Sequence, residues 1–156
     1  AELFKTRTGT DIRHIPFRGA APMVTELLAE RIDISFATLP SVIAHIEAGS
    51  MKALAVASAR RAPRLPQVPT LKEAGIEGVE ADAWFALFAP AQTPPATLAR
   101  LYRAVESAFA KDRPRQALAA QGMTLVLRSP QDMSAMIPVE VAKWAEVIRN
   151  ARVSVE

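Results

Sequence analysis

The sequence predicts an α/β fold, and three observations lead to this prediction. In two places, at residues 12–31 and 32–49, a short apolar segment is followed by a turn of small residues and then by an amphipathic segment that starts at a proline. Residues 52–57 form a further run of mostly small apolar residues, which is typical of a parallel strand covered on both faces. The alternation of strands and helices favours mostly parallel sheets flanked by helices.

Residues 1–7 are expected to be helical, and the first strand–turn–helix unit follows them. The apolar segment 12–17 predicts a short strand, and residues 18–21 (RGAA) predict a tight turn. Pro22 fits the first helical position, where its missing N–H costs nothing. The helix is expected to end near Arg31, with its apolar side chains on one face.

The second unit has the same order. Isoleucine and phenylalanine alternate with polar residues over 32–36, which predicts a short strand. Residues 37–39 form a second turn of mostly small residues, and a helix is expected to begin at Pro40 and to stop at Gly49.

The middle of the chain is expected to be irregular. Residues 62–69 are rich in proline, and Thr70 and Glu73 have the spacing of a capping box, closed by Gly75. Residues 82–89 form an aromatic and apolar run that predicts an extended segment, with a plain core strand as the alternative.

The last third of the chain is predominantly helical in pattern. A helix capped by Thr93 is predicted first, then a shorter helix from Asp112 to Gly122, and then a strand at 123–127. Residues 129–132 (SPQD) place N-cap, N1 and N3 residues at the start of the last helix.

The last helix carries an apolar stripe that is expected to be buried. The stripe consists of Met133, Met136, Ile137, Val141, Trp144 and Ile148. Pro138 lies inside it and is expected to kink or interrupt the helix.

Composition excludes several classes of function. The 156 residues normally make one domain, and half of them are apolar, which is enough for a sizeable core. The formal net charge is only +3 and there is no basic stripe, so no nucleic-acid partner is expected. The absence of cysteine excludes disulfides, thiol catalysis and cysteine–metal sites. Residues 83–99 carry no charge, but prolines interrupt them, so a membrane-spanning helix is not expected.

Catalytic motifs are also missing, so an enzyme is not expected. There is no G-x-S-x-G, no H-E-x-x-H and no glycine-rich phosphate loop. The histidines, His14 and His45, are expected to be structural. No metal and no cofactor is predicted.

The stretch 14–33, HIPFRGAAPMVTELLAERID, resembles the HVPYKGxAPAxTDLLGGQVD segment of one family. This is the tripartite tricarboxylate transporter substrate-binding protein family, the Bug or TctC-like periplasmic solute receptors. Residues 52–75, 84–101, 119–126 and 140–148 agree with the family in order and spacing. The resemblance covers nearly all of this chain, whereas a family protein is about twice as long.

This resemblance implies a fold and a division of the chain. The fold would be periplasmic binding protein type II-like, with only part of its two-lobed architecture present. Residues 1–82 would be the C-terminal part of the second lobe, and residues 83–156 a return segment belonging to the first lobe. The N-terminal half and its signal peptide would lie upstream of Ala1.

The resemblance also implies a site. Family receptors hold a small carboxylate in the cleft between the lobes, mainly through backbone N–H groups and waters. The matching positions are Phe17, Gly19, Ala20 and Ala21 in the first turn, Ala37 and Thr38 in the second, and Trp84 near the crossover. Both turns follow strands, at the edge where open α/β sheets collect ligands. Core packing is the alternative for Trp84.

The second turn departs from the family pattern. Many relatives have Phe-Asp-Asn where this chain has Phe36-Ala37-Thr38. The missing aspartate removes a partner for a ligand amino group, which favours a plain carboxylate over an amino acid.

The predicted function is therefore a fragment of a periplasmic receptor that delivers small organic carboxylates to the membrane subunits of a tripartite tricarboxylate transporter. The chain is also expected to form homo-oligomers, because sheet edges left unpaired recruit another chain. One alternative function is a truncated fragment that binds no ligand and associates through such exposed edges. The other is the effector-sensing domain of a regulator.

Overall fold

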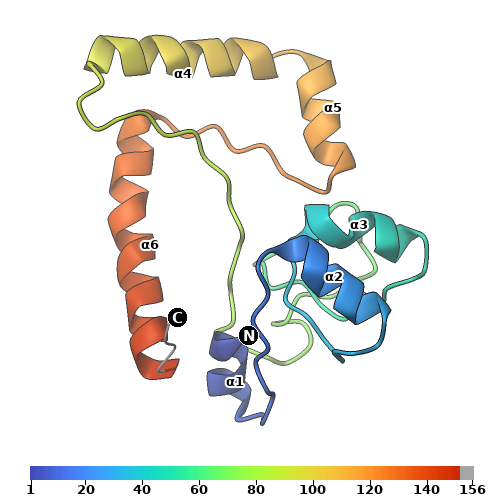
Figure 1. The fold of residues 1–156 in the computed structure, drawn as a ribbon. Coiled ribbons are helices and arrows are strands. Elements are labelled where there is room, and N and C mark those ends of the chain that lie inside the picture. Colours follow the sequence, from blue (N-terminus) through green and yellow to red (C-terminus); the bar gives the residue numbers. More distant parts are fainter. Residues whose placement is uncertain (152–156) are drawn as a thin grey trace. The chain divides into compact units, whose positions relative to one another are not determined.

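The computed structural model describes residues 1–151, and the elements found there are helices (Figure 1). They are α1 (Glu2–Thr8), α2 (Ala20–Leu28), α3 (Leu39–Glu47), α4 (Pro95–Phe109), α5 (Asp112–Ala120) and α6 (Pro130–Ala151). Each of the helices expected from the sequence is present, with ends shifted by a few residues. The shift is largest for α2, which begins before Pro22 and ends at Leu28, short of Arg31.

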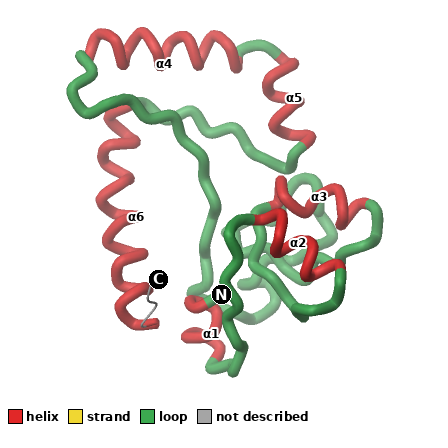
Figure 2. The backbone as a smooth tube through the Cα atoms, viewed as in Figure 1, coloured by secondary structure: helices red, strands yellow, loops and turns green. Residues whose placement is uncertain are grey.

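The predicted sheets, in contrast, are not found within residues 1–151. Figure 2 draws as loops the segments that were expected to be strands, namely 12–17, 32–36, 52–57 and 123–127. The β-type pairing in this part of the chain is one isolated parallel bridge between Val56 and Thr70. A strand needs a neighbouring strand to pair with its N–H and C=O groups, and among the described residues only the segment 52–57 has such a pairing, limited to this one bridge.

The chain divides into two compact units. Unit 1 contains residues 1–83 and 121–123, and the described part of unit 2 contains residues 84–120 and 124–151. Unit 1 therefore takes in a short segment from much later in the sequence.

Unit 1 has a small hydrophobic core. Ile43 of α3 packs with Leu65 and Val68 of the proline-rich loop, and these side chains are 6%, 3% and 5% exposed. α2 contacts α3, and the two helices lie side by side in Figure 1. The loop thus covers the apolar face of α3 that a sheet was expected to cover.

The predicted capping box closes this loop. The backbone N–H of Glu73 donates to Thr70 Oγ1 at 3.0 Å, and the backbone N–H of Thr70 donates to Glu73 Oε2 at 2.8 Å. Arg61 adds a bond from Nε to Glu73 Oε2 at 2.8 Å and one from Nη1 to the Pro66 carbonyl at 2.9 Å. The Arg61 guanidinium and the Thr70 N–H hold the pKa of Glu73 below its usual value.

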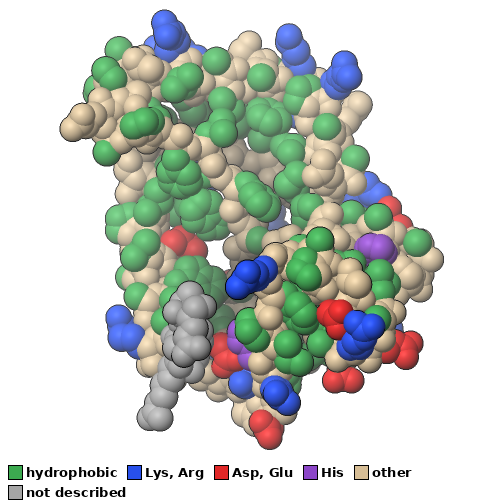
Figure 3. Space-filling model, viewed as in Figure 1, with side chains coloured by type: hydrophobic (Ala, Val, Ile, Leu, Met, Phe, Trp, Pro, Cys, Tyr) green, Lys and Arg blue, Asp and Glu red, His purple; other side chains and the backbone are tan. Residues whose placement is uncertain are grey.

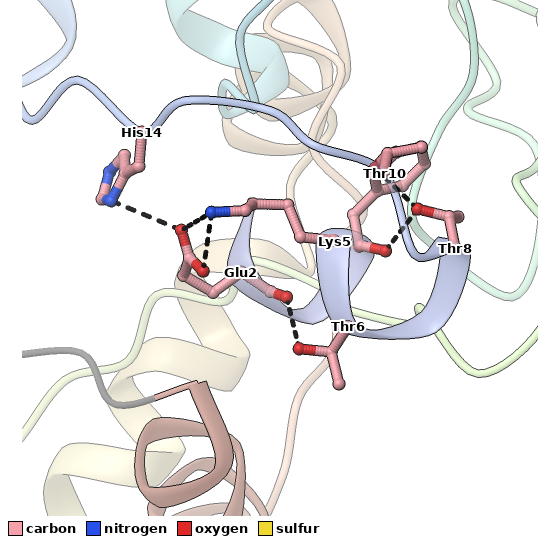
Figure 4. Close-up of polar contacts among 7 residues, drawn as sticks. Glu2, Lys5, Thr6, Thr8, Thr10 and His14 are labelled. Atoms are coloured by element: carbon pink, nitrogen blue, oxygen red, sulfur yellow. Dashed lines mark hydrogen bonds and ion pairs between the residues drawn. The ribbon is translucent and has the colours of Figure 1, made fainter.

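α1 is linked to the following segment by polar and aromatic contacts. Glu2 forms an ion pair with Lys5 at 3.3 Å, and His14 Nδ1 lies 3.7 Å from Glu2 Oε1 (Figure 4). The rings of Phe4 and Phe36 lie 5.5 Å apart between centroids. His14 is exposed and lies outside any strand, so the strand expected around it is not found, and its contact with Glu2 is with a side chain of α1.

Unit 2 consists of α4, α5, α6 and their connections. As predicted, Ser129 caps α6, because the Asp132 N–H donates to Ser129 Oγ at 3.1 Å. α6 continues through Pro138 without interruption. α4 differs from the prediction: its N-cap is Pro94, and Thr93 makes no side-chain capping bond.

The apolar stripe of α6 is only partly covered. Val141 and Ile148 are 62% and 47% exposed. Hydrophobic side chains are visible over α4 and α6 on the face shown in Figure 3. The expectation of a buried stripe is wrong for this part of the chain, because no sheet lies beneath it among the described residues.

Candidate functional site

The first predicted turn lies at the N-terminus of α2. Gly19 is the N-cap with φ 105° and ψ 178°, a conformation essentially restricted to glycine, and its N–H donates to the Phe17 carbonyl at 2.9 Å. No side chain caps the helix, so the N–H groups of Ala20 and Ala21 in the first turn are available to an external acceptor. Gly19, Ala20 and Ala21 are exposed, and Phe17 is half-buried.

The second predicted turn lies at the N-terminus of α3. Thr38 is the N-cap, and its carbonyl accepts from the Ser41 N–H at 3.0 Å and from the Ser41 hydroxyl at 2.7 Å. The Thr38 hydroxyl donates to Ser41 Oγ at 3.4 Å and makes no capping bond to a backbone N–H of the helix, so its oxygen can still accept a hydrogen bond. Ala37 and Thr38 are half-buried. The hydroxyl of Thr38 therefore remains within reach of a small polar ligand.

Both turns lie at helix N-termini, so they have a similar electrostatic environment. The N-terminal end of a helix carries a partial positive charge, which a carboxylate in the first turn would neutralise. Neither α2 nor α3 has an acidic residue in its first turn. Two uncompensated positive helix ends therefore lie in unit 1, on helices that contact each other.

A further residue supports the second turn and was not expected to do so. Gly122 has φ +72°, and a Cβ added to it would lie 2.5 Å from Cδ2 of Leu39, the first residue of α3. Sequence reasoning assigned Gly122 only to the end of the preceding helix. Its positive φ was foreseeable from that position, but its contact with α3 was not.

Trp84 lies in unit 2 and lines a cavity of about 430 Å³ there. Its main partners in that cavity are Phe88, Ile137, Val141, Trp144 and Ile148. Neither of the two cavities found in unit 2 is lined by the residues of the two turns.

The described residues show no arrangement suited to a metal. Within residues 1–151, no group of three histidine, aspartate or glutamate side chains is placed to hold a metal ion. In the same range, no helix has both the length and the apolar character needed to cross a membrane.

Solved structures of similar proteins share the fold of this chain. It aligns with the R. palustris protein Rpa4515, solved with adipate, at a TM-score of 0.89 and 36% identity, covering 98% of this chain and 51% of that one. It aligns with MatC from Rhodopseudomonas palustris, solved with bound malate, at a TM-score of 0.80 and 28% identity, covering 94% and 51% of the two chains.

The family follows from the sequence comparisons. The model of the tripartite tricarboxylate transporter family receptor, TctC, matches residues 1–153, so the chain belongs to this receptor family. Protein BugT of Bordetella pertussis is 37% identical over 149 residues, which are 96% of this chain and 46% of BugT. The chain thus spans about half the length of these relatives.

Proposed function

We propose that this chain is part of a periplasmic receptor that binds small organic carboxylates and delivers them to the membrane subunits of a tripartite tricarboxylate transporter. Membership of the receptor family supports this proposal, as do the adipate and malate bound by two similar proteins. The observation that carries it is the pair of uncapped helix N-termini at Gly19 and Thr38.

The chemistry of the two turns suits a carboxylate. Free N–H groups in the first turn of a helix bind anions, and the helix dipole adds a favourable field. The conformation of Gly19 keeps side-chain atoms away from the amides of Ala20 and Ala21, and nothing lies within 4 Å of the position a Cβ would occupy. The Thr38 hydroxyl would supply one further polar contact. Phe17 and Ala37 would form the walls beside these groups.

The proposal includes a lobe assignment. We propose that residues 1–82 belong to one lobe and residues 83–156 to the other, as a type II-like binding protein requires. The division of the chain between residues 83 and 84 supports this boundary. The sheets of both lobes would then be completed by strands from the part of the relatives that this chain does not match. Trp84 would then be the first residue of unit 2 after this boundary, and it remains one of the proposed ligand residues.

Calorimetric titration with adipate and with malate tests the binding. Both dicarboxylates are expected to bind, and a diamine of the same length as adipate is not, since the positive helix ends repel it. Arg18→Ala is expected to slow association with little change in affinity, because Arg18 is exposed and acts through its field. Absence of binding with every dicarboxylate would contradict a ligand-binding role for this chain.

The backbone mechanism has its own test, Gly19→Val. The branched side chain is expected to block the amides of α2 and to abolish measurable binding. Gly75→Val is the matched control, because Gly75 also has a positive φ with open space around it but lies outside both turns. Equal affinity in the two variants would rule out the backbone cradle.

A further inference from the structure

Leu39, the first residue of α3, contacts two parts of unit 1. Its side chain packs against the core cluster of Ile43, Leu65 and Val68. It also lies against Gly122, because the position that a Cβ of residue 122 would take is 2.5 Å from Leu39 Cδ2 and 2.9 Å from Leu39 Cγ. Non-bonded carbon atoms keep about 3.5–4.0 Å between them. Residue 122 therefore has no room for even one methyl group.

Gly122 differs in this respect from the other glycines. All six glycines lie in the described part of the chain and have a positive φ, so backbone conformation alone accounts for a glycine at each position. Only at Gly122 would an added Cβ come within 3.0 Å of another atom. The packing of Leu39 is thus a second and separate reason for a glycine at residue 122.

The contact bears directly on the second turn of the candidate site. Thr38, the N-cap of α3, precedes Leu39, and its carbonyl accepts from the Ser41 N–H at 3.0 Å. This hydrogen bond holds Thr38, Leu39 and Ser41 together as one turn. A methyl group at residue 122 could be avoided by rotating the Leu39 side chain, but the rotation would withdraw that side chain from the core. The alternative is to displace the turn, by about 1 Å to restore ordinary contact.

A displacement of this size is large for a hydrogen-bonding site. Hydrogen bonds from backbone N–H groups to oxygen are about 2.7–3.2 Å long, and they weaken steeply outside this range. A carboxylate held by the start of α3 and by the start of α2 together would lose its fit to one of them. The two turns cannot both keep their contacts if only one of them moves.

We propose that Gly122 is a positioning residue for the ligand site. By leaving room for Leu39, it sets where the first turn of α3 presents its N–H groups and the Thr38 hydroxyl. The proposal rests on the proposed function, since it takes the start of α3 to be part of the carboxylate site. It adds a determinant of affinity that lies far from both turns in the sequence.

Calorimetric titration with adipate tests the effect on binding. Gly122→Ala is expected to weaken adipate binding by about tenfold, because the turn is displaced. Gly49→Ala is the matched control, since Gly49 lies just after α3, has φ +74° against +72° for Gly122, and has open space around it. It should bind adipate like the unmodified chain. A purely structural role would lower the thermal stability of Gly122→Ala without lowering the affinity of the folded protein. Equal affinities of the two folded variants would overturn the proposal.

Removing the obstructing atoms provides a rescue. Leu39→Ala deletes Cγ and both Cδ atoms and leaves Leu39 Cβ, which is 3.8 Å from the added methyl group, an ordinary contact. In this background Gly122→Ala should weaken binding no more than Gly49→Ala does. If Gly122→Ala does not fold alone, the Leu39→Ala change should restore folding. A loss that persists in the Leu39→Ala background would contradict the role of this contact.

A measurement without ligand separates this proposal from the proposed function. The amide chemical shifts of Thr38, Leu39 and Ser41 are expected to change in Gly122→Ala and to stay the same in Gly49→Ala. Absence of adipate binding by the unmodified chain would count against the proposed function, and the shifts would still decide whether Gly122 sets the position of the turn. Unchanged shifts in Gly122→Ala would refute the assignment of Gly122, whether or not adipate binds.

Discussion

Units 1 and 2 are built from similar amphipathic helices, but they differ in what covers the apolar faces. In unit 1 a loop folds over α3, and Leu65 in that loop is only 3% exposed. In unit 2 no described residue reaches that degree of burial, and Leu87 is 86% exposed. Amphipathic helices are thus present in both units, whereas a buried core forms only where a second layer covers their apolar faces.

The largest expected loss of stability comes from a substitution in the core of unit 1. Leu65→Ala should cost about 2–5 kcal/mol, because it leaves a cavity beside Ile43. Leu87→Ala, the same change in unit 2, should change stability by no more than about 0.5 kcal/mol. Hydrogen exchange of the α3 amides measures the first effect and that of the α6 amides the second, with urea unfolding of each variant as an independent check. Equal losses of stability in the two variants would mean that the apolar side chains of the two units are covered to the same degree.

The next prediction tests how much residues 121–123 contribute to the stability of unit 1. Gly122→Ala adds a methyl group against Leu39 and also strains a positive φ, so it should cost about 1–3 kcal/mol more than strain alone. Gly49→Ala is the matched control, with φ +74° and open space around it. Thermal unfolding of the two variants gives the difference directly. If both variants lose the same stability, the contact with α3 contributes nothing.

The smallest expected effect is on the stability of the protein at acid pH. The folded pKa of Glu73 lies below its usual value of 4.5, so its contribution to stability is present above that value and is lost as pH falls through the folded pKa. Glu73→Gln should flatten this part of the stability–pH curve, since a neutral amide pairs with Arg61 at any pH. Glu77→Gln, on an exposed neighbour, serves as control. An unchanged acid limb in Glu73→Gln would contradict this assignment.

Local structure was predictable from local chemistry. The capping boxes at Thr70–Glu73 and Ser129–Asp132 were foreseen because the bonding groups lie three residues apart. The sheets were predicted but are not found within residues 1–151, because strand pairing depends on neighbours distant in sequence.

The candidate site was predictable only in part. The turns before α2 and α3 were placed correctly at helix starts, since small residues and prolines indicate them. Whether they hold a ligand stays a prediction. The contact between Gly122 and Leu39 could not be predicted from the sequence, because packing between residues far apart in the chain leaves no periodic pattern in the sequence.

The same contact has a consequence for how the protein is made. More than half of the chain separates Leu39 from Gly122, so closing this contact carries the entropy of a long loop. On the ribosome, α3 is synthesised long before the residue that packs against its start. Leu39 can pack against the core residues Ile43, Leu65 and Val68 early, but its contact with Gly122 forms only after α4 and α5 have been translated, and unit 1 is finished only when residues 121–123 have emerged.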